Sequence, residues 1–116
     1  MYNSFTNNKE KNMAKFLLLH KGGTQPQTDE QKAAVLAEWN TWMAAVGEHM
    51  VDAGNPTSNV KTVSAAGIAD FVGDRIGGYN IVEAESLDQA AEWAKTNPTV
   101  TLNGGSVDVY ETFNIM

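Results

Sequence analysis

The sequence contains no cysteine, which excludes disulfide bonds and thiolate chemistry. Positive charge is also scarce, because 8 Lys and Arg residues stand against 14 Asp and Glu residues and leave a net charge of −6. This balance disfavours binding to nucleic acid and to anionic lipid, since both need clusters of basic side chains. No apolar run is long enough to span a bilayer. We therefore expect a cytoplasmic protein that binds neither nucleic acid nor membranes.

The length of 116 residues is that of one domain, and 42% hydrophobic with 19% charged side chains is the composition of a folded chain. Residues 1–12 are polar, have no hydrophobic period and lack the apolar stretch of a signal peptide. We expect them to form a tail ahead of a domain at residues 13–116. The alternative is that residues 1–12 become ordered on a partner chain.

The first half of the domain is predicted to form a strand and a long helix. Residues 14–20 (AKFLLLH) make a short apolar run before a pair of glycines, which is typical of a strand covered on both faces. Thr28, with Gln31 three positions later, forms a capping box and predicts the start of a helix that runs to about residue 51. The apolar face of this helix comprises Val35, Leu36, Trp39, Met43, Val46 and Met50.

The second half is predicted to supply the remaining strands and a second helix. Residues 79–84 alternate between two faces, as a half-buried strand does. Ser86 and Gln89 form a second capping box, and Asn97-Pro98 ends the helix, because the residue before a proline is pushed out of the α conformation. Further strands are predicted at residues 60–65, 68–72 and 106–113, the first two forming a hairpin.

This order of elements predicts an α+β fold, the ferredoxin-like βαββαβ sandwich. Right-handed crossovers place both helices over one face of the sheet, which leaves the other face without helices. Several strands are apolar on both sides, and a small domain does not expose such a sheet to water. We therefore expect a two-fold homodimer in which the open sheet faces pack together.

The chain has two histidines, and neither belongs to a recognisable metal motif. His20 ends the first strand, where an imidazole can act as acid or base near neutral pH; the alternative is a histidine bonded to backbone. His49 lies at the edge of the apolar stripe of the long helix, which favours a boundary role. Because zinc sites are usually marked by close ligand pairs, we expect no metal. The glycine pair after His20 lacks the spacing of a phosphate or dinucleotide loop, and we expect no cofactor.

Aromatic and acidic residues complete the candidate site. Tyr79, Asp108 and Tyr110 lie on predicted strands and, with His20, can line a cleft between the sheet and a partner. Trp42 lies on the flank of the helix stripe, where it caps either a cleft or an interface. The alternative for each of these side chains is ordinary packing in the core or at an edge.

Five stretches of the chain carry a resemblance to a known family: AKFLLLH, EWNTWMAAVGEHMVDAGNP, KTVSAAGI, GGYNIVEAESLDQAAEWAKTNP and GGSVDVYETF. Together they resemble the YCII-related proteins, in particular the branch named for its DGPF motif. The resemblance covers roughly residues 13–113. It implies a dimeric α/β-barrel, in which two ferredoxin-like units pack sheet to sheet.

The sequence departs from the family pattern in two places. The DGPF motif is absent, and the corresponding region has the sequence ADFVGDRIGG. Enzyme-like relatives use a histidine near the start of the long helix together with an aspartate, whereas the sequence TDEQKAAVLAEW has no histidine there. The resemblance therefore assigns no catalytic residue. It implies an uncharacterised small-molecule-binding or regulatory module. The alternative is a cofactor-free isomerase, lyase or hydrolase that uses His20 as acid or base.

Overall fold

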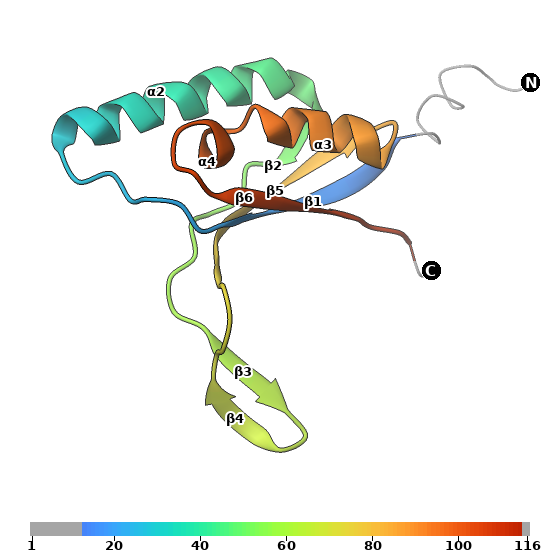
Figure 1. Ribbon diagram of the computed structural model, residues 1–116. Helices are drawn as coiled ribbons and strands as arrows, with labels where there is room; N and C mark the ends of the chain where they lie inside the picture. The colour runs from blue at the N-terminus through green and yellow to red at the C-terminus, as the bar shows by residue number, and fades with distance from the viewer. Residues whose placement is uncertain (1–12, 115–116) are drawn as a thin grey trace, which may run out of the picture.

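Four antiparallel strands form the main sheet of the computed structural model, which describes residues 13–114 (Figure 1). The strands lie in the order β2 (Met50–Asp52), β5 (Ile76–Ala84), β1 (Ala14–Lys21) and β6 (Ser106–Glu111). Helices cover one face of this sheet, so the predicted α+β, ferredoxin-like architecture is confirmed. The predicted tail at residues 1–12 lies outside the described residues.

Two capped helices and one short helix form the covering layer: α2 (Asp29–Val46), α3 (Leu87–Lys95) and α4 (Pro98–Thr101). At the start of α2, Thr28 Oγ1 accepts from the Gln31 amide at 3.0 Å, and the Gln31 side chain accepts from the Thr28 amide at 3.2 Å. The predicted capping box is therefore present. Ser86 caps α3 in the same way, with the Gln89 amide at 3.1 Å. None of the helices within residues 13–114 is both long and apolar enough to cross a membrane.

The core lies between the sheet and the two longer helices. It consists of Phe16, Leu18, Val82 and Ala84 from the strands and of Trp42, Val46, Ala90 and Ala94 from the helices. Every second residue of β1 and β5 is buried, as a strand with one face on the core requires. Trp42 also donates from Nε1 to the Trp93 carbonyl at 2.8 Å, which ties α2 to α3.

The long helix ends earlier than its hydrophobic pattern predicts. Gly47 adopts a positive φ of 60°, and its amide bonds to the Met43 carbonyl as a C-terminal cap. A single 3-10 turn, η1 (Gly47–His49), then leads into β2, where Met50 pairs with Val82. The prediction of a helix to about residue 51 is therefore wrong. Leu36, which we predicted on the buried face, is 62% exposed.

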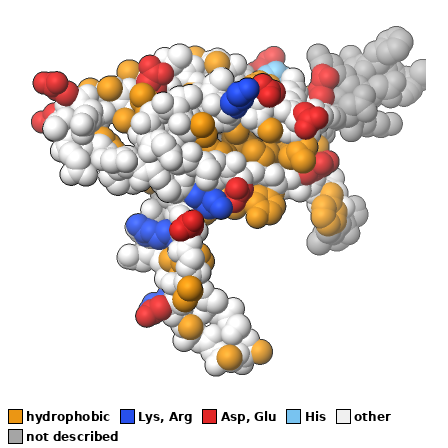
Figure 2. Space-filling view, viewed as in Figure 1, with side chains coloured by type: hydrophobic (Ala, Val, Ile, Leu, Met, Phe, Trp, Pro, Cys, Tyr) orange, Lys and Arg blue, Asp and Glu red, His pale blue; other side chains and the backbone are white. Residues whose placement is uncertain are grey.

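The predicted hairpin exists, but it stands apart from the main sheet. β3 (Lys61–Ser64) and β4 (Gly67–Asp70) pair only with each other and project away from the side that the helices cover (Figure 1). The place that we predicted for residues 60–65 in the main sheet is taken by β2. Figure 2 shows hydrophobic side chains along the projecting hairpin.

The sheet face opposite the helices has a row of apolar and aromatic side chains. Leu17 of β1 lies between Ile81 and Tyr110, and Leu19 lies between Tyr79 and Asp108. Cross-strand partners share a face, so these six residues face away from the helices. No element of residues 13–114 packs over this face in Figure 1.

Candidate functional site

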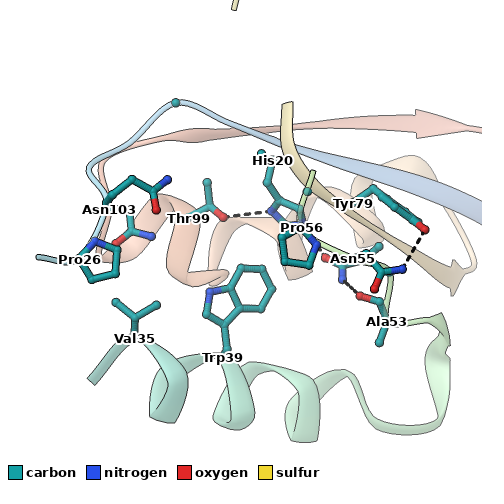
Figure 3. Close-up of a pocket in the computed structure, with 16 residues that line it drawn as sticks. His20, Pro26, Val35, Trp39, Ala53, Asn55, Pro56, Tyr79, Thr99 and Asn103 are labelled. Atoms are coloured by element: carbon teal, nitrogen blue, oxygen red, sulfur yellow. Dashed lines mark hydrogen bonds between the residues drawn. The ribbon is translucent and has the colours of Figure 1, made fainter. Parts of the chain in front are cut away.

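A cavity of about 420 Å³ lies between α2 and one end of the sheet (Figure 3). His20 of β1 and Asn80 of β5 reach it from the sheet, Trp39 from α2 and Thr99 from α4. Val35 of α2 also lines it, and the remaining wall comes from the loops and strand β5, through Gly22, Gln25, Pro26, Ala53, Gly54, Asn55, Pro56, Gly77, Gly78, Tyr79 and Asn103. Its size is within the usual range for small-ligand pockets.

His20 is held at both ring nitrogens by buried side chains. Nε2 lies 2.5 Å from Asn80 Oδ1, and Nδ1 lies 3.1 Å from Thr99 Oγ1. Asn80 donates from Nδ2 to the Ala53 carbonyl, which fixes its Oδ1 as an acceptor. His20 Nε2 therefore carries the proton, and Nδ1 accepts from the Thr99 hydroxyl. This pair of bonds fixes the tautomer and the orientation of the ring.

The protein environment keeps this imidazole neutral. Burial lowers the pKa of His20 below the ordinary value of 6.5, and the hydrogen bond with Asn80 opposes the shift only in part. Its three closest side-chain partners, Asn80, Thr99 and Trp39, do not ionise. At neutral pH the ring is thus an uncharged polar wall of the cavity.

An aromatic wall adjoins the imidazole. The Trp39 indole meets the His20 ring edge to face, with 5.3 Å between centroids, and packs in the same way on Trp42 at 5.7 Å. Trp39 is only half-buried because part of its ring faces the cavity. Figure 3 shows it rising from α2 towards His20. Such a surface suits a flat or apolar part of a ligand.

Contacts on two sides of the cavity hold its rim. Gly54 has a φ of +71°, and a Cβ there would lie 1.7 Å from the Tyr79 carbonyl oxygen, so only glycine allows this close approach. Asn55 Nδ2 donates to the Tyr79 hydroxyl at 3.4 Å. On the other side, the Thr24 amide bonds to the Asn103 carbonyl at 2.8 Å. Asn55 and Asn103, which both line the cavity, are thus held at its rim.

The cavity has no charged wall. Among its lining residues only His20 and Tyr79 can ionise, and Asp, Glu, Lys and Arg are absent from them. No group of three or more His, Asp or Glu residues within the described chain could hold a metal ion. A charged ligand would therefore find no opposite charge to compensate its lost hydration.

We compared the sequence with models of known protein families. The YCII-related domain matches residues 14–115. The chain belongs to the YCII-related domain family. No curated protein matches the chain.

The structure of this YCII-related chain brings together two of the residues singled out from the sequence. His20 and Tyr79 both line the cavity, but the register places the Tyr79 side chain on the open face of the sheet, opposite the face of His20. Asp108 and Tyr110 lie on the opposite face of the sheet from His20, and Trp42 lies in the core behind Trp39. A cleft shared by His20, Asp108 and Tyr110 is therefore absent from the described residues.

Asp108 has a different partner. Its carboxylate accepts a hydrogen bond from Lys21 Nζ at 2.6 Å, and this bond raises the pKa of the Lys21 ammonium. The pair lies partly exposed at the open sheet face. Its position fits the border of an apolar surface and not the cavity.

Sequence reasoning missed the two side chains that bond to His20. Asn80 lies on the buried face of β5, where its register places it opposite Leu18 of β1 and two residues from Val82. An asparagine in the inward-facing series of a strand is a signal for a polar partner, because buried amides need hydrogen bonds. Thr99 was missed because α4 itself was missed. Asn97-Pro98 is the usual beginning of a helix, with Asn97 Oδ1 accepting from the Thr99 amide at 2.8 Å.

Proposed function

We propose that the protein is a cytoplasmic small-molecule-binding module that takes an uncharged, partly flat organic molecule into the cavity beside His20. The observation that carries this proposal is the lining itself. An indole and a neutral imidazole supply the walls, and amide side chains supply the rim, with no charge among them. A planar group would lie against Trp39, and its polar atoms would bond to the carboxamides of Asn55 and Asn103.

The hydrogen bonds of His20 favour binding over direct acid–base catalysis. Both ring nitrogens already have buried partners, so a ligand would reach neither without displacing Asn80 or Thr99. Loss of a buried hydrogen bond costs roughly 1–3 kcal/mol, which a weak ligand does not recover. The ring therefore acts as a positioned, polar surface.

A thermal-shift comparison of matched probes tests this function. Benzamide, benzoate and benzylamine have similar shapes but are neutral, anionic and cationic near pH 7.5. We expect benzamide to raise the melting temperature more than the two charged probes. Trp39→Ala is expected to abolish the shift. Leu36→Ala is the matched control, since Leu36 is on the same helix but faces solvent. A preference for benzoate, or an unchanged shift in Trp39→Ala, would contradict the proposal.

A second candidate function, hydrolysis, is favoured by one observation. The Thr99 hydroxyl, the His20 ring and the Asn80 amide form a continuous chain of hydrogen bonds, the order of nucleophile, base and orienting group. In this alternative, Thr99 Oγ attacks an uncharged ester and His20 Nδ1 takes its proton and passes it to the leaving alcohol. Water, which gives a proton to His20 Nδ1, then attacks the acyl ester on Thr99. The acid leaves, and the proton returns to Thr99 Oγ.

The two candidates differ in measurable ways. With p-nitrophenyl acetate, hydrolysis predicts turnover above the solvent rate and an acetylated Thr99 in the mass spectrum. Thr99→Val keeps the shape of the side chain and removes the hydroxyl, so it is expected to abolish both signals. If binding of benzamide survives in Thr99→Val and the wild type shows no turnover, the binding module stands and the hydrolase is excluded.

We further propose that the chain forms a homodimer through the open sheet face, as two halves of a dimeric α/β-barrel. The support is the row of apolar side chains around Leu17 and Leu19, which have no cover in the described chain. Sedimentation equilibrium tests it: Leu17→Asp is expected to give monomers. Leu87→Asp is the control, because Leu87 is exposed on α3 and away from this face. A wild type that stays monomeric would exclude the dimer.

A further inference from the structure

Residues 57–75 form an arm, and the hairpin of β3 and β4 is its distal part. No other part of the described chain, residues 13–114, pairs with this hairpin. All residues of both strands are exposed. An isolated two-stranded hairpin is at best marginally stable in water. The hairpin therefore needs packing against another surface to be stably ordered.

One face of this arm combines an apolar pair with an ion pair, because Lys61 and Asp70 lie two residues from Val63 and Ile68 on the same face. Val63 pairs directly with Ile68, and the two share a face; they are 73% and 75% exposed. At the base of the arm, Val72 is 90% exposed and Phe71 is 37% exposed. Exposed apolar side chains concentrated on one projecting element are typical of a protein–protein contact (Figure 2).

The direction and length of the arm indicate what it contacts. It projects to the side of the sheet that has no helices, which is also the side of the open apolar face (Figure 1). From Thr57 to the turn at Ala65 the chain covers roughly 26 Å, at about 3.3 Å per residue. Two sheets packed face to face lie only about 10 Å apart. An arm of this length therefore passes the sheet of a second copy and reaches the flank of that copy.

Charge agrees with a second copy as the occupant. The whole chain has a net charge of −6, so two copies repel each other at most surfaces. The arm has Lys61 and Arg75 with Asp70 and Asp74, which sum to zero, and Lys61 Nζ bonds Asp70 at 2.6 Å. It is thus a neutral, apolar projection on an acidic protein. A basic partner would gain nothing from such a surface.

We propose that the arm of each subunit docks through Val63 and Ile68 on the flank of a second copy of this chain. The proposal rests on the sheet-to-sheet dimer proposed above and adds a second, separate contact to it. The stem of the arm is already fixed to the body, because the Thr57 amide and hydroxyl bond to the Gly77 and Ile76 carbonyls at 3.0 and 2.6 Å. Only the distal part of the arm needs the partner.

Paired substitutions on the two faces of the arm test this docking. Val63→Asp with Ile68→Asp replaces the apolar pair of the arm by two carboxylates. Thr62→Asp with Ala69→Asp places the same charge on the other face, since Thr62 pairs with Ala69. In sedimentation equilibrium we expect the first pair to raise the dimer dissociation constant by at least about a hundredfold, because both arms lose their buried contacts. The second pair is expected to change it by less than about tenfold.

Trypsin gives a second readout that does not depend on the dissociation constant. Lys61 and Arg75 lie on the arm, and the dimer is expected to protect both from cleavage. Dilution below the dissociation constant, or the Val63→Asp/Ile68→Asp pair, is expected to expose them. Far-UV circular dichroism checks that each variant keeps its fold, which we expect because the altered side chains are exposed.

The outcomes separate this inference from the proposed dimer. If Leu17→Asp dissociates the dimer but both arm pairs leave it unchanged, the sheet-face dimer stands and arm docking is excluded. Equal cleavage of the arm in dimer and monomer would also exclude it. A wild type that is monomeric at every concentration would overturn both proposals.

Discussion

The burial of His20 predicts a pH dependence of stability that can be assigned to this residue. Burial lowers the pKa of His20 in the folded state, while the unfolded chain keeps a value of about 6.5. Between these two values the unfolded state binds more protons than the folded state. The free energy of unfolding therefore rises with pH in this window. The contribution of His20 to stability is lost as the pH falls from 6.5 towards the pKa of the folded state.

The size of the effect has an upper limit set by one proton. If His20 stays neutral in the folded protein, the loss between about pH 7.5 and about pH 5.5 is RT ln 10, or about 1.4 kcal/mol. Carboxylates titrate mainly below this range, since their ordinary pKa values lie near 4. For a domain of about this size, such a loss lowers the melting temperature by roughly 5 °C.

Urea unfolding at a series of pH values, followed by tryptophan fluorescence, measures this slope. His20→Gln removes the titrating group and is expected to flatten the curve between pH 7.5 and 5.5 to within about 0.3 kcal/mol. Leu36→Ala is the control and is expected to keep the wild-type slope, because it alters an exposed side chain on α2 and leaves the contacts of His20 in place. A flat wild-type curve, or a slope that persists in His20→Gln, would refute the assignment of a buried neutral imidazole.

Three further changes test the packing by the same unfolding measurement. Trp42→Phe removes the donor to the Trp93 carbonyl and is expected to cost roughly 1–3 kcal/mol; a neutral result would show that water replaces it. Thr28→Ala opens the capping box of α2 and is expected to cost about 1 kcal/mol, whereas Thr28→Ser should retain most of that stability. Gly54→Ala places a Cβ against the Tyr79 carbonyl at a positive φ, and more than about 2 kcal/mol should be lost. Unchanged stability in Gly54→Ala would mean that the loop moves freely.

Local chemistry was sufficient to predict the starts of the two longer helices and the inward face of the first strand. The Thr28 cap depends on residues within one turn, so the sequence contains all of its partners. The alternation that placed Phe16, Leu18 and His20 on one face is likewise a property of one strand. These parts of the fold were predictable because their causes are close in the sequence.

Elements defined by distant partners were not predictable in this way. β2 has only three residues, and Met50 becomes part of a strand through its pairing with Val82 of β5. A run so short has no period of its own, and the helix pattern before it extends naturally across it. The end of α2 depended on Gly47, whose helix-breaking tendency is only about 1 kcal/mol relative to alanine, too little to end the helix by sequence pattern alone.

The site shows the same limit. The sequence indicated His20, but its partners Asn80 and Thr99 are 60 and 79 positions away. Whether Asp108 shares a face with His20 depends on the register between β1 and β6, where Asp108 pairs with Leu19. A register shift of one residue between β1 and β6 would place the Asp108 side chain on the other face of the sheet. The composition of the cavity is therefore a product of register, which a single sequence does not determine.

The shortness of β2 has a consequence for the behaviour of the protein at high concentration. Any open sheet offers its outer backbone groups to other chains, and this is a common start of fibrous assembly. Here one border is three residues long and irregular after Met50, and the other, β6, bears the carboxylates of Asp108 and Glu111. Neither border offers a long, flat and uncharged template. Lateral growth of the sheet from molecule to molecule is thereby discouraged, even though much of the chain is rich in strand-forming residues.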